Sequence, residues 1–235
     1  MAKATKTQTA TAVTQEPQNN SLPLEYDVRI NSLRNSSAIK GIASVTLNGQ
    51  FAVRNVSIVE GKNGLFVSLP SNKLQNGEYN DVCFPCTTEA RATFDKAVLD
   101  AYKNVLTNGL DNQNKESAAQ LPVNYDVRIQ SQSFGGSALR GQASVSINNQ
   151  FAIRKVSIME SSKGLFVSLP GFKANNGEFR DHCFPCTKES RAEFDKAVLD
   201  AYRQAITQNQ AAGQGMEAPN PFESSAYSAA PMMQM

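Results

Sequence analysis

A seven-residue segment occurs twice in this chain, and this internal repeat constrains the fold more than any other feature. The sequence GLFVSLP spans Gly64–Pro70 and returns unchanged at Gly164–Pro170, one hundred positions later. Self-similarity at a fixed offset indicates a repeated structural unit. Most paired positions around these two segments are also identical, so the 235-residue chain is expected to hold two copies of one small domain.

The repeat sets the expected domain boundaries. We assign the first domain to residues 23–106 and the second to residues 123–206, with a polar linker at 107–122 that has no apolar period. Residues 1–22 and 207–235 are rich in small and polar side chains, so we expect disordered tails there. An extra residue lies in the loop before Gly141, compared with the loop before Gly41, which indicates a surface loop.

Each copy has the pattern of several β-strands. Apolar residues alternate with polar ones from Tyr26 to Ile30 and again from Ala43 to Leu47, which is typical of half-buried strands. Asn48-Gly49 then predicts a tight hairpin. The apolar phase slips after Val53, which predicts a bend or bulge at Arg54-Asn55.

Further strands follow in each copy. Gly64–Leu69 is almost entirely apolar, so we expect a strand buried on both faces. The Asn-Gly-Glu sequence at 76–78 predicts a turn into another strand that reaches Cys83 and is stopped by Pro85.

A helix is expected to close each copy. Apolar residues from Ala90 to Val105 recur at helical spacing, and Thr87 or Thr88 can cap the first turn. The predicted fold class is therefore α+β: two tandem copies of a small antiparallel β-sheet domain with one C-terminal helix, packed as an intramolecular pseudo-dimer.

Charge gives only weak support for a polyanionic partner. The net charge is +2 and the isoelectric point about 8.3, far below that of most charge-driven nucleic-acid binders. The charge is uneven: residues 24–106 hold nine Lys and Arg against eight Asp and Glu, and residues 125–206 hold eleven against eight. The second copy is thus the better candidate for contact with an anion.

No apolar run is long enough to span a membrane and no secretory signal is present, so a cytoplasmic protein is expected.

Two Cys-x-x-Cys pairs leave three interpretations open. Cys83 and Cys86 recur as Cys183 and Cys186. They are small apolar side chains at a strand-to-helix junction, or a four-thiolate zinc site that forms if the copies meet, or redox pairs ahead of a helix. We expect the first, with no cofactor and no metal.

Catalytic patterns are missing. His182 is the only histidine, and the first copy has Val82 in its place, so no general base of this type is shared. No phosphate-binding glycine loop, Ser-His-Asp set or carboxylate-rich metal motif appears. We therefore do not expect an enzyme.

Basic residues at three kinds of position are the candidate phosphate contacts. They lie near the turn after the apolar strand, at the predicted bend and on the helix: Lys73, Lys173, Arg180, Arg54, Arg154, Lys155, Arg91 and Arg191. Paired copies would present these charges in duplicate across a twofold axis, and duplicate sets can follow a phosphate backbone. No aromatic platform for base stacking is evident, apart from Phe172 beside Lys173.

Three segments of the first copy together carry a family resemblance: the GLFVSLPS block at 64–71, the Asn-Gly-Glu turn at 76–78 and the helix segment KAVLDAY at 96–102. With these segments the chain resembles the SpoVG family, the stage V sporulation or septation protein G of bacteria. The second copy matches at least as well, with Gly-Glu-Phe-Arg-Asp at 177–181. The resemblance covers nearly all of both copies and neither tail. It implies a small α+β domain that dimerises through its sheet and a cytoplasmic regulator that binds DNA and RNA, with links to septation and sporulation.

The chain also departs from the family pattern. The family has Ala-His-Pro-Ile where this chain has residues 83–86, so the cysteines are not a family feature. The family's basic pair is reduced to Lys73 or Lys173, and its next arginine is Asn80 in the first copy but survives as Arg180. We expect a nucleic-acid-binding regulator that uses mainly its second copy. The alternative is a non-catalytic protein-interaction scaffold that has lost this binding, and pseudo-dimers can also associate further.

Overall fold

The computed structural model describes residues 23–35, 37–73, 77–113, 119–132, 137–174 and 176–214, with side chains described up to residue 208. The expected tails at 1–22 and, from residue 215, at the C-terminus lie outside the described residues, as does part of the expected linker. Helix continues beyond the boundary expected at 206 and reaches Gln214.

The described residues of each repeat form seven strands followed by one long helix. The first repeat comprises β1 (Tyr26–Leu33), β2 (Ile39–Leu47), β3 (Phe51–Gly61), β4 (Gly64–Ser68), β5 (Ser71–Lys73), β6 (Tyr79–Asp81), β7 (Cys83–Pro85) and α1 (Thr88–Asn108), with a short 3₁₀ turn at Leu110–Asn112. The second comprises β8 (Tyr125–Gln132), β9 (Leu139–Ile147), β10 (Phe151–Ser161), β11 (Gly164–Ser168), β12 (Gly171–Lys173), β13 (Phe179–Asp181), β14 (Cys183–Pro185) and α2 (Lys188–Gln214). The predicted α+β class and the tandem repeat are confirmed.

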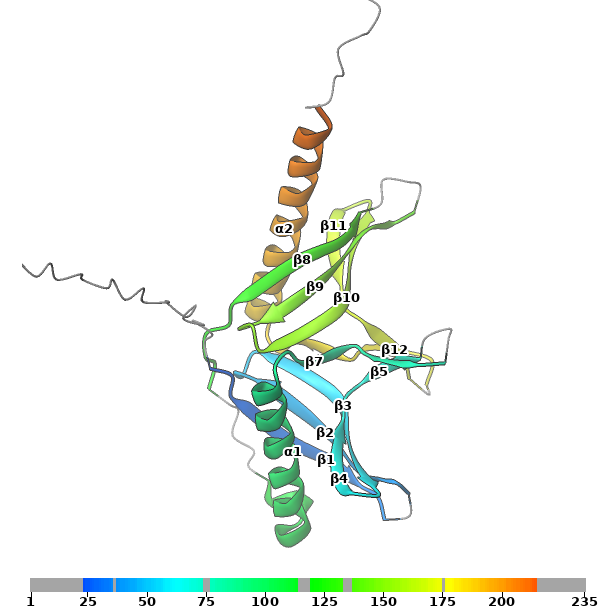
Figure 1. The fold of residues 1–235 in the computed structure, drawn as a ribbon, viewed down its shortest axis with the longest axis vertical. Coiled ribbons are helices and arrows are strands. Elements are labelled where there is room, and N and C mark those ends of the chain that lie inside the picture. Colours follow the sequence, from blue (N-terminus) through cyan, green and yellow to red (C-terminus); the bar gives the residue numbers. More distant parts are fainter. Residues whose placement is uncertain are drawn as a thin grey trace, which may run out of the picture.

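The repeats exchange short strands. In the first sheet β1, β2 and β3 are followed by β14 of the second repeat, with Cys183 opposite Val53. In the second sheet β7 of the first repeat pairs with β10 in the same register. Figure 1 shows both helices on the left, running outward from the middle of the molecule, while β5 and β12 extend to the right.

The predicted bulge at Arg54-Asn55 is confirmed, and it divides β3 between two partners. Val53 lies opposite Val45 and Val56 lies opposite Ala43, so two residues of β3 face one residue of β2. Asn55 has a positive φ of 59°. The part of β3 before the bulge pairs with β14, and the part after it pairs with β4. The bulge thus allows one long strand to pair with a strand of its own repeat and with a strand of the other repeat.

The strand expected to run on to Cys83 is in fact two strands. β6 pairs with β5 to form a separate two-stranded ribbon, whereas β7 crosses to the other repeat. Val82 lies between them and donates its N–H to the Pro70 carbonyl, 2.9 Å away, which closes the base of the ribbon. Pro85 is itself the last residue of β7, where the strand lies at the sheet edge and the missing N–H is tolerated.

The expectation that Gly64–Leu69 is buried on both faces is wrong. β4 is an edge strand that pairs only with β3, and α1 covers only one of its faces. Val67 and Leu69 are buried, whereas Phe66 is 49% exposed and Phe166 of the second repeat is 45% exposed. A continuous apolar run in this case reflects one covered face and one open face.

One continuous core joins the two repeats. Phe94 of α1 packs edge-on against Tyr26 of its own repeat, with ring centroids 5.4 Å apart, and against Phe151 of the second repeat at 5.8 Å. Phe194 of α2 repeats this arrangement with Tyr125 and Phe51, at 5.3 and 5.6 Å. Each helix therefore closes a core to which the other repeat contributes one fully buried phenylalanine.

The helices form as their sequence pattern predicts. The Thr87 hydroxyl oxygen accepts a hydrogen bond from the N–H of Ala90, 3.1 Å away, which satisfies one of the unpaired donors of the first turn. The buried residues of α1 recur every three or four positions: Ala90, Phe94, Val98, Tyr102 and Val105. The helix lies against the strands of its own repeat and also contacts β7 at the junction that leads into it.

Candidate nucleic-acid interface

Two β-ribbons project from the middle of the molecule and carry several of the predicted phosphate contacts. β5 and β6 form one ribbon, and β12 and β13 form the other. Lys73 lies directly opposite Tyr79, and Lys173 lies directly opposite Phe179. Directly opposed residues of an antiparallel pair point to the same face, so each ribbon presents one ammonium group and one aromatic ring together.

The aromatic rings of these pairs are almost free of packing. Tyr79 is 71% exposed and Phe179 is 81% exposed. Neither residue could be predicted from the sequence pattern, because a three-residue strand is too short for its alternation to reveal the free face. Their equivalence across the repeat, each beside a Gly-Glu turn, is the signal that could have found them.

The opposite face of each ribbon differs between the repeats. Arg180 lies opposite Phe172, whereas the first repeat has Asn80 opposite Asn72. Arg180 forms an ion pair with Glu178 at 3.1 Å. Phe172 is half-buried and stacks on His182, with ring centroids 4.8 Å apart, so one face of this expected platform is already occupied.

The bulges bring a second pair of cations to the base of the ribbons. The guanidinium of Arg54 lies 4.1 Å from the centroid of Phe184, and that of Arg154 lies 4.2 Å from Phe84. Both contacts cross between repeats. Arg154 also donates a hydrogen bond to the Asn80 side-chain oxygen. A guanidinium stacked on a ring keeps N–H groups at its edge for other acceptors.

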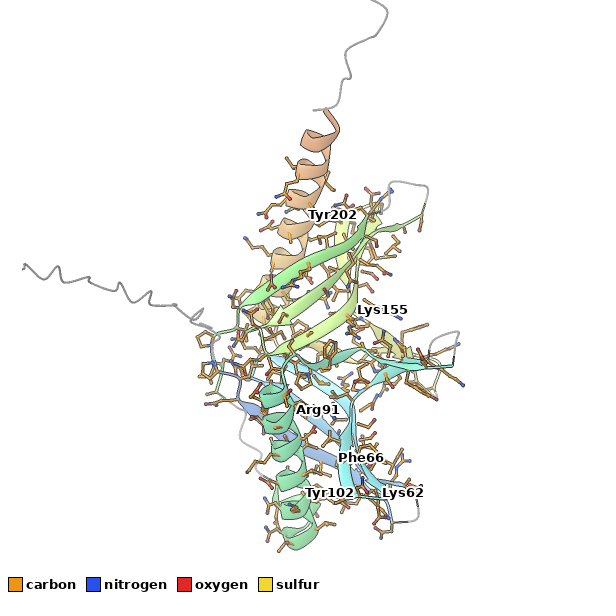
Figure 2. The ribbon with its side chains drawn as sticks, in the orientation of Figure 1. Lys62, Phe66, Arg91, Tyr102, Lys155 and Tyr202 are labelled. Carbon is orange, nitrogen blue, oxygen red and sulfur yellow. The ribbon has the colours of Figure 1, made fainter. Side chains whose placement is uncertain are left out.

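The bulge of the second repeat also carries an exposed lysine. Lys155 has a positive φ of 57° and takes the place of Asn55. Figure 2 shows Lys155 on β10, to the right of the helices and toward the ribbons. Among the residues that the structure describes, Lys73, Lys155 and Lys173 form no ion pair. These three ammonium groups are therefore available to an external anion.

The helix arginines hold structure together instead. Arg91 pairs with Asp95 at 2.9 Å and donates to the Val67 carbonyl at 2.6 Å. Arg191 makes the same two contacts with Asp195 and Val167. Each arginine thus ties the start of its helix to the edge strand. Figure 2 places Arg91 at the helix side of the molecule, away from Lys155.

Burial shifts the pKa of the carboxyls at the ribbon bases. The pKa of Asp81 is raised by its partial burial, and Arg91 and Arg154 partly oppose this shift. The pKa of Asp181 is raised for the same reason, with Arg191 and Arg54 opposing. Each carboxylate is therefore influenced by the charge of one helix arginine and of one bulge arginine.

The four cysteines do not come together. Cys83 and Cys183 are buried and close to one another, and their contact and burial raise the pKa of the Cys183 thiol well above its usual value. Cys86 and Cys186 are exposed residues on the outer side of the junctions, where desolvation raises the pKa of both thiols. No group of three or more metal-ligating side chains occurs within the described ranges. The four thiols are thus divided into a buried pair and two exposed residues, and they do not form the four-thiolate cluster that the zinc interpretation needs.

His182 lies at the base of the second ribbon and is only 7% exposed. Neither ring nitrogen has a hydrogen-bond partner among the described residues. Desolvation lowers the pKa of this imidazole, so its neutral form is favoured. Its ring packs against Phe172 with the two planes tilted by 33°, in a position that Val82 fills in the first repeat.

Comparison with known proteins decides the family. The model of the SpoVG family matches residues 25–104 and, separately, residues 123–204. The chain belongs to the SpoVG family. Both matches lie inside the repeats, so this is a tandem form in which two SpoVG units share one chain.

Single-unit relatives are similar to one repeat. The chain is 40% identical over 90 residues to the "Putative septation protein SpoVG" of Clostridium novyi, a match that covers 38% of this chain and 90% of the relative. It is 46% identical over 78 residues to the protein of that name in Desulforudis audaxviator, covering 33% and 89%. One SpoVG repeat therefore has about the length of a whole relative. Of the described helices, none is both long and apolar enough to cross a membrane.

Proposed function

We propose that this tandem SpoVG protein binds nucleic acid and acts as a non-catalytic regulator. The observation that carries the proposal is the grouping of unpaired lysines on the two ribbons and the neighbouring bulge. Membership of the SpoVG family supports it, because resemblance to that family implies nucleic-acid binding. The relatives are named for septation, and regulation of septation is the process that we propose this binding serves.

The contact surface follows from the charges that remain free. Lys73, Lys173 and Lys155 have no ion-pair partner among the described residues. Arg54 and Arg154 are held by rings and keep part of their donor edge. Arg180 adds a cation on the second ribbon, although Glu178 partly neutralises it. Arg91 and Arg191 are left out of the surface, because both already bind a carboxylate and a backbone carbonyl.

The second repeat is expected to contribute more than the first. It carries Lys155 and Arg180 where the first has Asn55 and Asn80. Contacts of this kind engage phosphates, so binding should depend weakly on sequence and strongly on salt.

The test is a fluorescence-anisotropy titration of labelled DNA and RNA, single-stranded and double-stranded, at low and moderate salt. The Lys173→Ala/Arg180→Ala double variant should bind more weakly, and its log–log salt slope should fall by about 0.7 for each phosphate of a single strand that the protein no longer neutralises. Lys62→Ala/Lys163→Ala is the matched control: it removes the same charge from the tips of the β3–β4 and β10–β11 hairpins. Equal effects in both variants would show that net charge, not this surface, drives binding. Failure of the wild-type chain to bind at low salt would remove the proposed function.

A protein-interaction scaffold remains the second candidate, and the open edges of β4 and β11 favour it. Both strands pair on one side only and expose Phe66 and Phe166. Such edges can accept an added strand from a partner. This function predicts a protein bound at the edges and no affinity for nucleic acid in the titration above.

A further inference from the structure

We propose that the two ribbons bind single-stranded nucleic acid by stacking unpaired bases on Tyr79 and Phe179, while Lys73 and Lys173 contact the adjoining phosphates. This inference rests on the proposed nucleic-acid binding and specifies its ligand. It identifies a ring-and-lysine pair, in duplicate, as the element that selects single strands.

The first argument is the unusual exposure of the rings. Tyr79 and Phe179 are the most exposed of the large hydrophobic residues in the described parts of the chain, at 71% and 81%. A single exposed apolar residue needs no explanation. Here an aromatic ring stands free at equivalent positions of both repeats, on short ribbons that leave both sheets and contribute nothing to the shared core.

The second argument is the residue that faces each ring. Lys73 is directly opposite Tyr79, and Lys173 is directly opposite Phe179, with Cβ atoms about 4.5–5.5 Å apart in such pairs. A ring that only covered a protein partner would not need a cation beside it in both repeats. Aromatic platforms next to unpaired cations are the pattern by which proteins hold single strands, because every base has a stacking face and every nucleotide has a phosphate.

The same geometry disfavours a duplex. Bases inside a double helix are already stacked on both faces, so an external ring can reach them only after they are unstacked. Each ribbon consists of two three-residue strands, and a two-stranded ribbon that enters a major groove contacts base edges and phosphates, not the faces of the stacked bases. A duplex would meet the lysines without using the rings.

The ribbons that carry the rings are held at their bases by backbone hydrogen bonds. The Val82 N–H donates to the Pro70 carbonyl and the His182 N–H donates to the Pro170 carbonyl, both at 2.9 Å, so each ribbon is closed at its base. The N–H of Arg154 donates to the Val82 carbonyl at 2.8 Å, which fixes the first ribbon to the second repeat. A platform held in this way loses little freedom when a base stacks on it.

The experiment uses the full chain with labelled oligo-dT, oligo-rU and a duplex of the same length. In the Tyr79→Ala/Phe179→Ala variant, single-strand affinity should fall about tenfold or more for each ring removed, whereas duplex affinity should stay unchanged. The salt slope should also stay unchanged, because every cation is retained. Tyr79→Phe should bind like the wild type, since it keeps the ring.

Two controls separate stacking from other effects. Tyr79→Leu/Phe179→Leu keeps apolar surface without a π-face, and its affinity should fall nearly as far as that of the alanine variant. Phe66→Ala/Phe166→Ala removes two exposed rings away from the ribbons and should have no effect on binding. Circular dichroism should show all variants folded, because the two ribbon rings lie mostly in solvent.

The two single-stranded probes show whether DNA or RNA is the preferred source of unpaired bases, and stronger binding of either supports the proposal. Wild-type affinity of the alanine variant for both probes would overturn it while leaving the lysine-based function intact. A fall in molecular mass of the alanine variant, measured by light scattering, would overturn it too, because the rings would then belong to contacts between copies. No binding by the wild-type chain would overturn both.

Discussion

Replacing Phe151 by alanine should destabilise both repeats together, although this residue belongs to the second. Its ring is fully buried and packs 5.8 Å from Phe94, which lies on the helix of the first repeat. Removing a buried phenylalanine side chain costs about 3–5 kcal/mol, through the transfer free energy of the missing ring and the cavity left behind. That is a large share of the roughly 5–15 kcal/mol that stabilises an ordinary domain.

The strand exchange makes this destabilisation global. Phe151 also lies opposite Pro85 of β7 in the register that joins the two repeats, so its removal weakens the strand pairing as well as the core. Neither repeat can complete its own core, because each helix depends on a phenylalanine from the other. Unfolding should therefore be a single transition.

Urea unfolding followed by circular dichroism, together with native-state hydrogen exchange, measures the effect. The midpoint should fall with an unchanged slope, and protection of core amides in both repeats should fall by about 10²–10⁴, the equivalent of 3–5 kcal/mol. Phe51→Ala, the symmetric change, should give the same result. Phe66→Ala is the control, and should change stability by at most about 0.5 kcal/mol because its ring lies at the surface. Two separate transitions, or reduced protection confined to the second repeat, would refute the shared core.

Three further predictions concern single groups. Burial lowers the pKa of His182 below its usual 6.5, so the unfolded chain binds this proton more readily than the folded one. The free energy of unfolding should therefore decline as pH falls below about 6.5. Urea unfolding at several pH values measures this decline, and it should vanish in His182→Val. A thiol reagent should modify Cys86 and Cys186 in the folded protein and reach the other two thiols only in denaturant; early modification of all four would contradict the buried pair. Arg91→Ala should lower stability by about 1–2 kcal/mol by removing the charged hydrogen bond to a carbonyl, discounted for partial exposure, and leave the salt slope of nucleic-acid binding unchanged; a reduced slope would mean that this arginine contacts phosphate after all.

Several parts of the fold could be predicted from the sequence because they depend on neighbours along the chain. The phase slip after Val53 predicts the bulge, and the spacing from Ala90 to Val105 predicts the buried stripe of α1. The identity of GLFVSLP at two places predicts the repeat. In each of these cases the periodicity of side chains along one element carries the information.

The sequence by itself determined that the chain has two α+β units, where the bulge and the buried stripe of each helix lie, and which family the units resemble. Only the tertiary structure decided which strand lies beside which, because alternation shows which residues share a face but not what covers that face. Cys83–Pro85 could equally have paired within its own repeat, and Phe66 could equally have been covered. The free rings of Tyr79 and Phe179 are the same kind of result: β7 and β14 pair with the other repeat, the ribbons lie outside both five-stranded sheets, and the two rings stay largely exposed.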